Sequence, residues 1–314
     1  MQVTRMQMTL RDWSLLGLLS VLWGGSFFFV SVAVTEVPPL TVVLGRVGIA
    51  AIVLFAVLRL TGEAIPMRRE VLAAFLIMGL LNNLIPFSLF FWAQTSISGG
   101  LASILNATTP IFSIVVAHFV LADERLTVGK AVGVVLGLLG VVVLIGADAL
   151  SGISVATLGM VACLGAALSY GFASVYGRRF KTLGVSNRAG ACGQLMASTA
   201  MMIPVALVFD RPWTLPVPST AAVLAILALA VASTALAYVI YFRLIATSGA
   251  VNAALVTFLI PVSAILLGTT ILGETLAGQH IAGMALIAGG LLVVDGRMFR
   301  LAKRRAARLG NGRV

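Results

Sequence analysis

The chain has 314 residues, of which 60% are apolar and only 10% are charged. A soluble globular protein carries about 25% charged residues, so this composition excludes a water-soluble fold. At about 20 residues for each bilayer crossing, ten membrane spans with short loops account for the whole length.

Ten uninterrupted apolar segments predict ten transmembrane helices. The connections between them are short, and glycine or proline marks most of the boundaries, as expected where helices end. The predicted spans are residues 12–34, 38–60, 70–94, 100–121, 127–147, 155–177, 187–209, 219–245, 250–272 and 277–297. The sequence therefore predicts an all-α membrane protein whose main partner is the lipid bilayer.

The basic residues predict the orientation of these spans. With the N-terminus inside the cell, 19 of the 21 Lys and Arg residues fall in cytoplasmic segments, while Arg211 falls outside and Arg46 falls within the second span. Basic flanks are retained on the cytoplasmic side of a membrane. We therefore expect a multi-pass protein of the inner membrane with both termini cytoplasmic and a basic cytoplasmic tail over 298–314. The net charge of +11 then requires no nucleic-acid partner.

The two halves of the chain match each other when the sequence is shifted by about 150 residues. The matches are Phe91-Trp92 with Tyr241-Phe242, Ser98-Gly99 with Ser248-Gly249, Glu124 with Glu274, and Gly133, Gly140 and Gly146 with Gly283, Gly290 and Gly296. Each half, 12–147 and 155–297, holds five spans, and an odd number inverts the second copy. Inverted repeats let a central site open alternately to either face. The alternative is that glycine-rich helices align by composition alone.

Several motifs carry a resemblance to a known family. They are Trp23-Gly24-Gly25-Ser26 in the first span, the Pro110 and Pro261 spans that end in Asp123-Glu124-Arg125-Leu126-Thr127 and Gly273-Glu274-Thr275-Leu276, and the glycine-rich fifth and tenth spans. With these motifs the chain resembles the drug/metabolite transporter superfamily, in its ten-helix branch with two EamA-type repeats, over residues 12–297. Within that branch it looks most like the YddG-type aromatic amino-acid exporters. The resemblance implies a transporter; it is weak for the substrate, because members export amino acids, other metabolites or drugs.

Arg46 is the basic residue deepest in a predicted span. Eight residues separate it from Pro38, which places it about 12 Å inside at 1.5 Å per residue. A charge at the centre of a span costs about 2.5–3.5 kcal/mol even on insertion scales. One interpretation is a cation that binds a substrate carboxylate, and the other is a side chain that snorkels or bonds to helix carbonyls. The matching position in the second half is close to Gln194, which is polar but uncharged.

Polar and aromatic residues inside spans are the best markers of a central cavity, because they are costly against lipid. The predicted substrate-binding residues, besides Arg46, are Trp23, Asn82, Asn83, Phe87, Asn106, Tyr170, Tyr238 and Thr257. An apolar ring wall with a few amide and hydroxyl groups suits a neutral or zwitterionic solute. Each residue has a simpler alternative role as an interhelical hydrogen bond or an interfacial anchor.

Proline and glycine positions suggest mechanical roles. Pro110 and Pro261 lie inside matching spans, where proline removes a helix hydrogen bond, and we predict that they are hinges. Gly129, Gly133, Gly137 and Gly140 share one face of the fifth span, which predicts close helix packing. Glu124 and Glu274 precede matching helices on opposite faces, where a carboxylate favours the positive end of a helix dipole; gating is the alternative.

These features predict an exporter of small metabolites that works by alternating access. The expected substrates are amino acids with aromatic or large apolar side chains. The ten Asp and Glu residues all lie at or near loops, so we expect downhill transport without obligatory proton coupling. Drug or other metabolite efflux is the alternative. An intramembrane enzyme is disfavoured, because the sequence has no clustered carboxylates, histidine pair or metal motif. We expect no catalytic residues, cofactor or metal, and a functional monomer.

Overall fold

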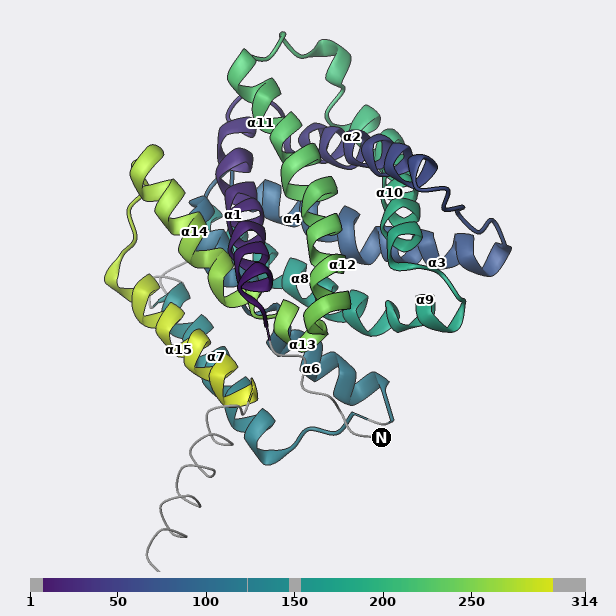
Figure 1. The fold of residues 1–314 in the computed structure, drawn as a ribbon. Helices are drawn as coiled ribbons and strands as arrows, with labels where there is room; N and C mark the ends of the chain where they lie inside the picture. Colours follow the sequence, from purple (N-terminus) through teal and green to yellow (C-terminus); the bar gives the residue numbers. More distant parts are fainter. Residues whose placement is uncertain (1–7, 123, 147–153, 296–314) are drawn as a thin grey trace, which may run out of the picture.

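The computed structural model describes residues 8–122, 124–146 and 154–295, which form helices joined by short loops (Figure 1). Asp123, the ends of the predicted fifth and tenth spans, and the basic segment 298–314 lie outside the described residues. The helices of the first half are α1 (Leu10–Ala33), α2 (Pro39–Leu60), α3 (Arg69–Gly79), η1 (Leu80–Leu84), α4 (Ile85–Ala93), α5 (Gly99–Asn106), α6 (Thr109–Val120) and α7 (Val128–Ile145). Those of the second half are α8 (Val155–Tyr176), α9 (Arg178–Thr182), α10 (Asn187–Phe209), η3 (Pro212–Thr214), α11 (Thr220–Ala230), η4 (Val231–Leu236), α12 (Ala237–Ser248), α13 (Ala250–Ala253), α14 (Val256–Ile271) and α15 (Gly278–Asp295).

The ten predicted spans are present. Eight helical segments are long and apolar enough to cross a membrane, and two shorter apolar helices, Val256–Ile271 and Gly278–Val294, complete the ten. The predicted all-helical fold with ten spans is therefore confirmed. Lipid offers backbone groups no hydrogen-bond partners, so a helix, which satisfies them internally, is the structure that such segments adopt.

Hydroxyl residues fix the starts of many of these helices. At each start the side chain accepts a hydrogen bond from the backbone amide three residues later, which satisfies one of the amides that a helix leaves unpaired. The residues that do so are Thr9, Ser98, Thr127, Ser154, Ser186 and Ser219. Serine and threonine N-caps in the loops thus set where most spans begin.

The same irregularities occur at matching places in the two halves. The third span changes to π-helix at η1, and the eighth span does so at η4. The fourth span breaks between α5 and α6, and the ninth breaks between α13 and α14. π-Helical turns inside α-helices are rare and concentrate at functional sites. Their repetition at equivalent positions supports two copies of one five-span unit.

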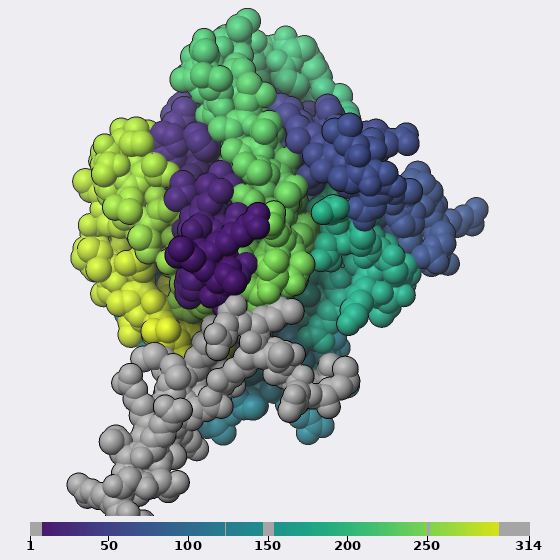
Figure 2. All heavy atoms as spheres, viewed as in Figure 1, coloured from purple at the N-terminus to yellow at the C-terminus, as the bar shows by residue number. Residues whose placement is uncertain are grey.

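Helix contacts follow the same symmetry. Helix α1 packs against α14 and α11 of the second half, and its counterpart α8 packs against α6 and α4 of the first half. Helices α2 and α10, the second spans of the two halves, pack against each other. Figure 2 shows α1 lying on the surface between segments of the second half on both sides. The halves are therefore interleaved rather than placed side by side.

The predicted glycine packing is present between α7 and α15, which run together at the edge of the molecule (Figure 1). A Cβ added at Gly133 would lie 2.6 Å from the carbonyl oxygen of Gly290, and one at Gly140 would lie 2.8 Å from that of Gly283. Only glycine permits backbones to approach so closely. Gly129, the first member of the predicted stripe, has nothing within 4 Å of such a Cβ and stands outside the contact.

Replacing Gly290 should therefore destabilise the fold. Gly290→Ala places a Cβ 2.6 Å from the carbonyl oxygen of Gly133, and we expect a loss of about 1–3 kcal/mol, the usual cost of overpacking. Thermal unfolding in detergent measures it. Gly289→Ala is the matched control, because its Cβ would meet Leu136 at an ordinary 3.6 Å. Equal stability of the two variants would contradict the close crossing.

Candidate functional site

Arg46 of α2 lies in the interior, with 7% of its surface exposed. Its Nε donates a hydrogen bond to Thr234 Oγ1 of η4 at 2.9 Å, and its guanidinium carbon lies 3.9 Å from the ring centroid of Phe87. The side chain therefore neither snorkels to an interface nor bonds to the carbonyls of its own helix. Instead it crosses to the second half of the chain. A desolvated cation–π contact contributes about 2 kcal/mol or somewhat more, whereas burying an ion costs several kcal/mol, so compensation is partial.

The remaining donors of Arg46 have no anionic partner in the part of the chain that the structure describes. The ion pairs found there join Glu124 to Lys130 and Arg178, and Glu63 to Arg188. The hydrogen bond of Arg46 uses Nε and leaves both terminal nitrogens available. Tyr170 and Tyr238 lie close enough to interact with its charge. A guanidinium with two free terminal nitrogens presents the geometry that binds a carboxylate through two hydrogen bonds.

A layer of hydrogen-bonded amides also joins the two halves of the chain. Asn83 of η1 is fully buried and donates to Ser198 Oγ of α10 at 2.9 Å. Asn82 donates to Gln194 Oε1 at 3.3 Å, and the Tyr238 hydroxyl of α12 donates to Asn83 Oδ1 at 3.4 Å. The structure thus brings Asn82, Asn83 and Tyr238 together, on elements from both halves.

Aromatic rings extend from this layer. Trp23 of α1 contacts Tyr241 at 5.2 Å between ring centroids, and Phe242 links Tyr241 to Tyr238. Tyr170 of α8 stacks on Phe90 at 6.2 Å. The predicted residues Trp23, Tyr170 and Tyr238 therefore belong to the aromatic contacts around the polar layer.

Two predicted site residues make local contacts instead. The Thr257 hydroxyl bonds to the carbonyl of Ala254, and Asn106 Oδ1 accepts a long 3.5 Å hydrogen bond from Thr109. Both lie at helix breaks. Asn106 ends α5, and Thr257 lies near the start of α14.

The predicted hinge prolines lie differently with respect to these breaks. Pro110 is in the first turn of α6, directly after the break in its span, whereas Pro261 lies inside α14, beyond the break at 254–255.

Sequence reasoning missed three polar members of the site: Thr234, Ser198 and, as a direct participant, Gln194. A signal for Thr234 was available. At a shift of 151 residues Asn82-Asn83 falls on Ser233-Thr234, and both pairs lie in the π-helical segments. Ser198 carried no comparable signal, because an isolated serine in an apolar helix often bonds to its own backbone.

A cavity of about 560 Å³ lies elsewhere, between α2, α3 and α10. Its walls are mainly apolar, with Arg59 and Glu63 among its lining residues. None of the predicted site residues lines it. Leu76 and Met196 of its lining are exposed, and the cavity shares no lining residue with the polar layer.

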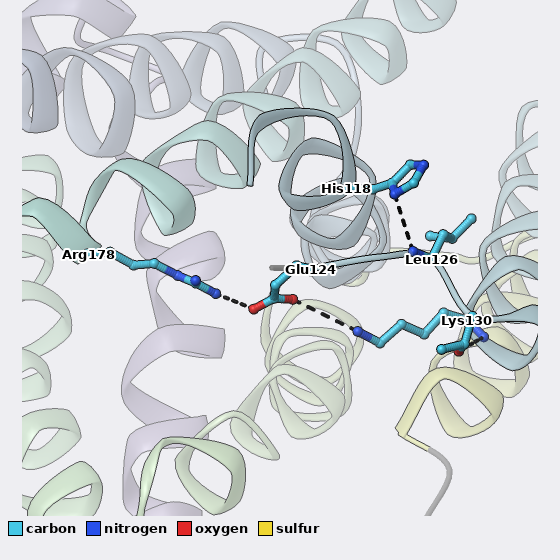
Figure 3. Close-up of polar contacts among 6 residues, drawn as sticks. His118, Glu124, Leu126, Lys130 and Arg178 are labelled. Atoms are coloured by element: carbon cyan, nitrogen blue, oxygen red, sulfur yellow. Dashed lines mark hydrogen bonds and ion pairs between the residues drawn. The ribbon is translucent and has the colours of Figure 1, made fainter. Parts of the chain in front are cut away.

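The two matched glutamates differ in their contacts. Glu274 accepts hydrogen bonds from the backbone amides of Gly99 and Gly100, at 2.9 and 3.0 Å, and so caps α5 of the first half rather than the helix that follows it. Glu124 pairs with Arg178 and, at 3.9 Å, with Lys130 (Figure 3). The prediction that each carboxylate serves its own next helix is wrong for Glu274, because the start of α5 lies closer.

Comparison with known proteins gives consistent results. The family model described as the EamA-like transporter family matches residues 12–146 and 157–294. The uncharacterized transporter YoaV of Bacillus subtilis (strain 168) is 29% identical over 261 residues, 81% of this chain and 87% of that protein. The uncharacterized inner membrane transporter YedA of Escherichia coli (strain K12) is 32% identical over 253 residues, 80% of this chain and 79% of that protein. A crystal structure of 24% identity shares the fold, with a TM-score of 0.63 over 89% of this chain and 96% of that chain.

Proposed function

We propose that this chain, which belongs to the EamA-like transporter family and is a multi-pass membrane transporter, exports small carboxylate-bearing metabolites from the cell. Amino acids with aromatic or large apolar side chains are the substrates that the candidate site suits best. They would bind between the two halves, near the middle of the membrane.

The environment of Arg46 is the observation that carries the proposal. A buried cation without an anionic partner is costly in a medium of low dielectric constant. A substrate carboxylate would supply the missing charge and accept hydrogen bonds from the two terminal nitrogens. The cost of burying Arg46 thereby favours binding of an anion over binding of a lipophilic cation.

The rings around the polar layer support the choice of side chain. Phe87 and Phe91 stack beside Arg46, and Trp23, Tyr170 and Tyr238 contribute further aromatic surface. Aromatic pairs contribute about 0.5–1.5 kcal/mol beyond the area that they bury. The amide oxygen of Asn82, which is half-buried and bonds to Gln194 through its nitrogen, is suited to accept a hydrogen bond from a substrate ammonium group.

Alternating access follows from the inverted repeats, for which we retain the boundaries 12–147 and 155–297. Two copies of one unit, crossing the membrane in opposite senses, have two equivalent arrangements that expose the site to opposite faces. Because the acidic residues lie at the ends of spans, we propose that the substrate moves down its own gradient. The basic residues favour an inner-membrane location with both termini cytoplasmic.

Arg46→Gln should weaken binding of carboxylate substrates by about tenfold to a hundredfold, because charge-assisted hydrogen bonds contribute about 1.5–3 kcal/mol. Exchange of an amino-acid panel in proteoliposomes measures the effect, with amino-acid amides and cationic dyes included. The amides should respond little, since they lack the carboxylate. Arg243→Gln, an exposed cation on α12, is the matched control. Wild-type exchange of carboxylates by a folded Arg46→Gln protein would refute the proposed site, and dye transport would favour drug efflux.

Transport should equilibrate the substrate and not concentrate it when a pH difference is imposed. The physical reason is that no carboxylate occupies the middle of a span, where its protonation would compete with substrate. Proteoliposomes with equal substrate on both sides and a pH difference across the membrane test this directly. Sustained accumulation driven by the pH difference alone would show proton coupling instead.

Reporter fusions test the orientation. A reporter inserted after Gly152 should be external and one fused after Val314 should be cytoplasmic, because 19 of 21 basic residues then lie on the cytoplasmic side. Paired reporters that are active on opposite sides of the membrane measure both positions. An external C-terminus would invalidate the proposed topology.

A further inference from the structure

Loops of one half are tied to helix starts of the other half at both membrane faces. On one face Glu36 accepts hydrogen bonds from the hydroxyl and the backbone amide of Ser219, both at 2.7 Å, and these bonds lower the pKa of Glu36. At the opposite face Arg68 donates to the carbonyl of Leu183 at 2.7 Å. Leu183 is the counterpart of Glu36 in the second half, 147 residues later. Arg68 and Ser219 are also counterparts, because each directly precedes the first residue of the third span of its half. This tie is therefore made at both faces.

A second tie is also made twice. Asp210 accepts hydrogen bonds from the backbone amide and hydroxyl of Thr41, at the start of α2, at 2.7 and 2.9 Å. Glu63, at the equivalent place in the first half, accepts a hydrogen bond from Ser186 at the start of α10. In each case the carboxylate that ends the second span of one half holds the beginning of the second span of the other half.

The third tie has different chemistry at the two faces. Glu274 bonds to the amides of Gly99 and Gly100 of the other half. At the matching position Glu124 instead pairs with Arg178 and Lys130 (Figure 3), and the amide of Gly249, the counterpart of Gly99, donates to the carbonyl of Ile245. Glu124 thus also joins the two halves, through Arg178 of the second half, but by an ion pair and not through helix amides.

The sequence explains why the two glutamates differ. On the Glu274 side, Ser31 corresponds to Arg178 at a shift of 147, and His280 corresponds to Lys130 at a shift of 150. Glu274 therefore has no equivalent pair of permanent cations. Carboxylates bind permanent cations or backbone amides according to which lie within reach. Glu124 is thus held by side chains of its own face.

Small residues make room for Glu274. A Cβ at Gly268 would lie 2.3 Å from Glu274 Oε2, and one at Gly100 would lie 3.2 Å from the same oxygen. The residue equivalent to Gly268 at the other face is His118, whose side chain leaves less space for a carboxylate. The position of Glu274 is therefore built for a bound carboxylate, and that of Glu124 is not.

We propose that Glu274 is a latch that holds its face of the transporter closed, and that the substrate passes through that face only when the bonds to Gly99 and Gly100 break. The Glu36 and Asp210 ties have counterparts at the opposite face and join the halves at both. The bonds from Glu274 to helix amides have no counterpart at the opposite face, where Glu124 joins the halves through an ion pair with Arg178 instead. On the proposed topology this is the external face.

Distances between spin labels test the latch. One label pair replaces Thr95 and Ala277, exposed residues on the two sides of the latch, in a Cys163→Ala/Cys192→Ala background. Glu274→Gln should increase the population with the longer distance about tenfold, the factor expected when one charge-assisted hydrogen bond is lost from a two-state equilibrium. Glu124→Gln is the matched control and should not lengthen the distance between these labels, because it weakens a bond at the opposite face.

A second pair at Ala246 and Val128 reports on the opposite face. Glu274→Gln should lengthen the first distance without lengthening this one. Unchanged distances in folded Glu274→Gln protein, or longer distances at both faces, would overturn the latch. If Glu274→Gln does not fold, Glu274→Asp keeps the charge, shortens the reach and should give the same opening. The latch rests on the alternating access of the proposed function. The distances are measured without substrate, however, so they test the latch even if the transport experiments fail.

Discussion

The need to satisfy every polar group inside the membrane organises this protein. Lipid supplies no hydrogen-bond partners, so the chain is helical wherever it spans, and each departure from the α-helix needs an internal partner. At the π-helical segment η4 the Thr234 hydroxyl donates to the carbonyl of Leu229 at 2.8 Å while its oxygen accepts from Arg46. An irregular turn and a buried cation are thus stabilised by the same side chain. The polar layer lies where the two halves can serve each other's unsatisfied groups.

The repeat gives the protein two versions of most contacts, and its asymmetries are therefore informative. Arg46 has a cationic side chain where the second half has Gln194, so only one half contributes the charge of the site. Glu274 binds backbone amides where Glu124 binds cations. A strictly symmetric transporter would have no preferred face. In the alternating access that we propose, such differences would make one arrangement more stable than the other, and a ligand would shift that equilibrium.

The candidate site could be predicted in part. Arg46, Asn82, Asn83, Trp23, Tyr170 and Tyr238 were recognisable, because polar and aromatic side chains in apolar spans are expensive against lipid and stand out from their neighbours. Ser198 was not, because a hydroxyl can bond to its own helix and so carries no such cost. Thr234 could be found only through its alignment with Asn83 across the repeat. Asn106 and Thr257 met the same criterion as the recognised residues but make local bonds at helix breaks.

The sequence by itself determined the ten spans, the two inverted halves and the glycine crossing of the fifth and tenth spans. These depend on composition, on the length of a bilayer crossing and on short-range periodicity, which are properties of contiguous residues. Only the tertiary structure decided which groups from the two halves meet: Arg46 with Thr234, Asn83 with Ser198, and Glu274 with the amides of α5. Backbone amides are alike in every sequence, so which of them a carboxylate reaches depends on how helices distant in the chain are packed together.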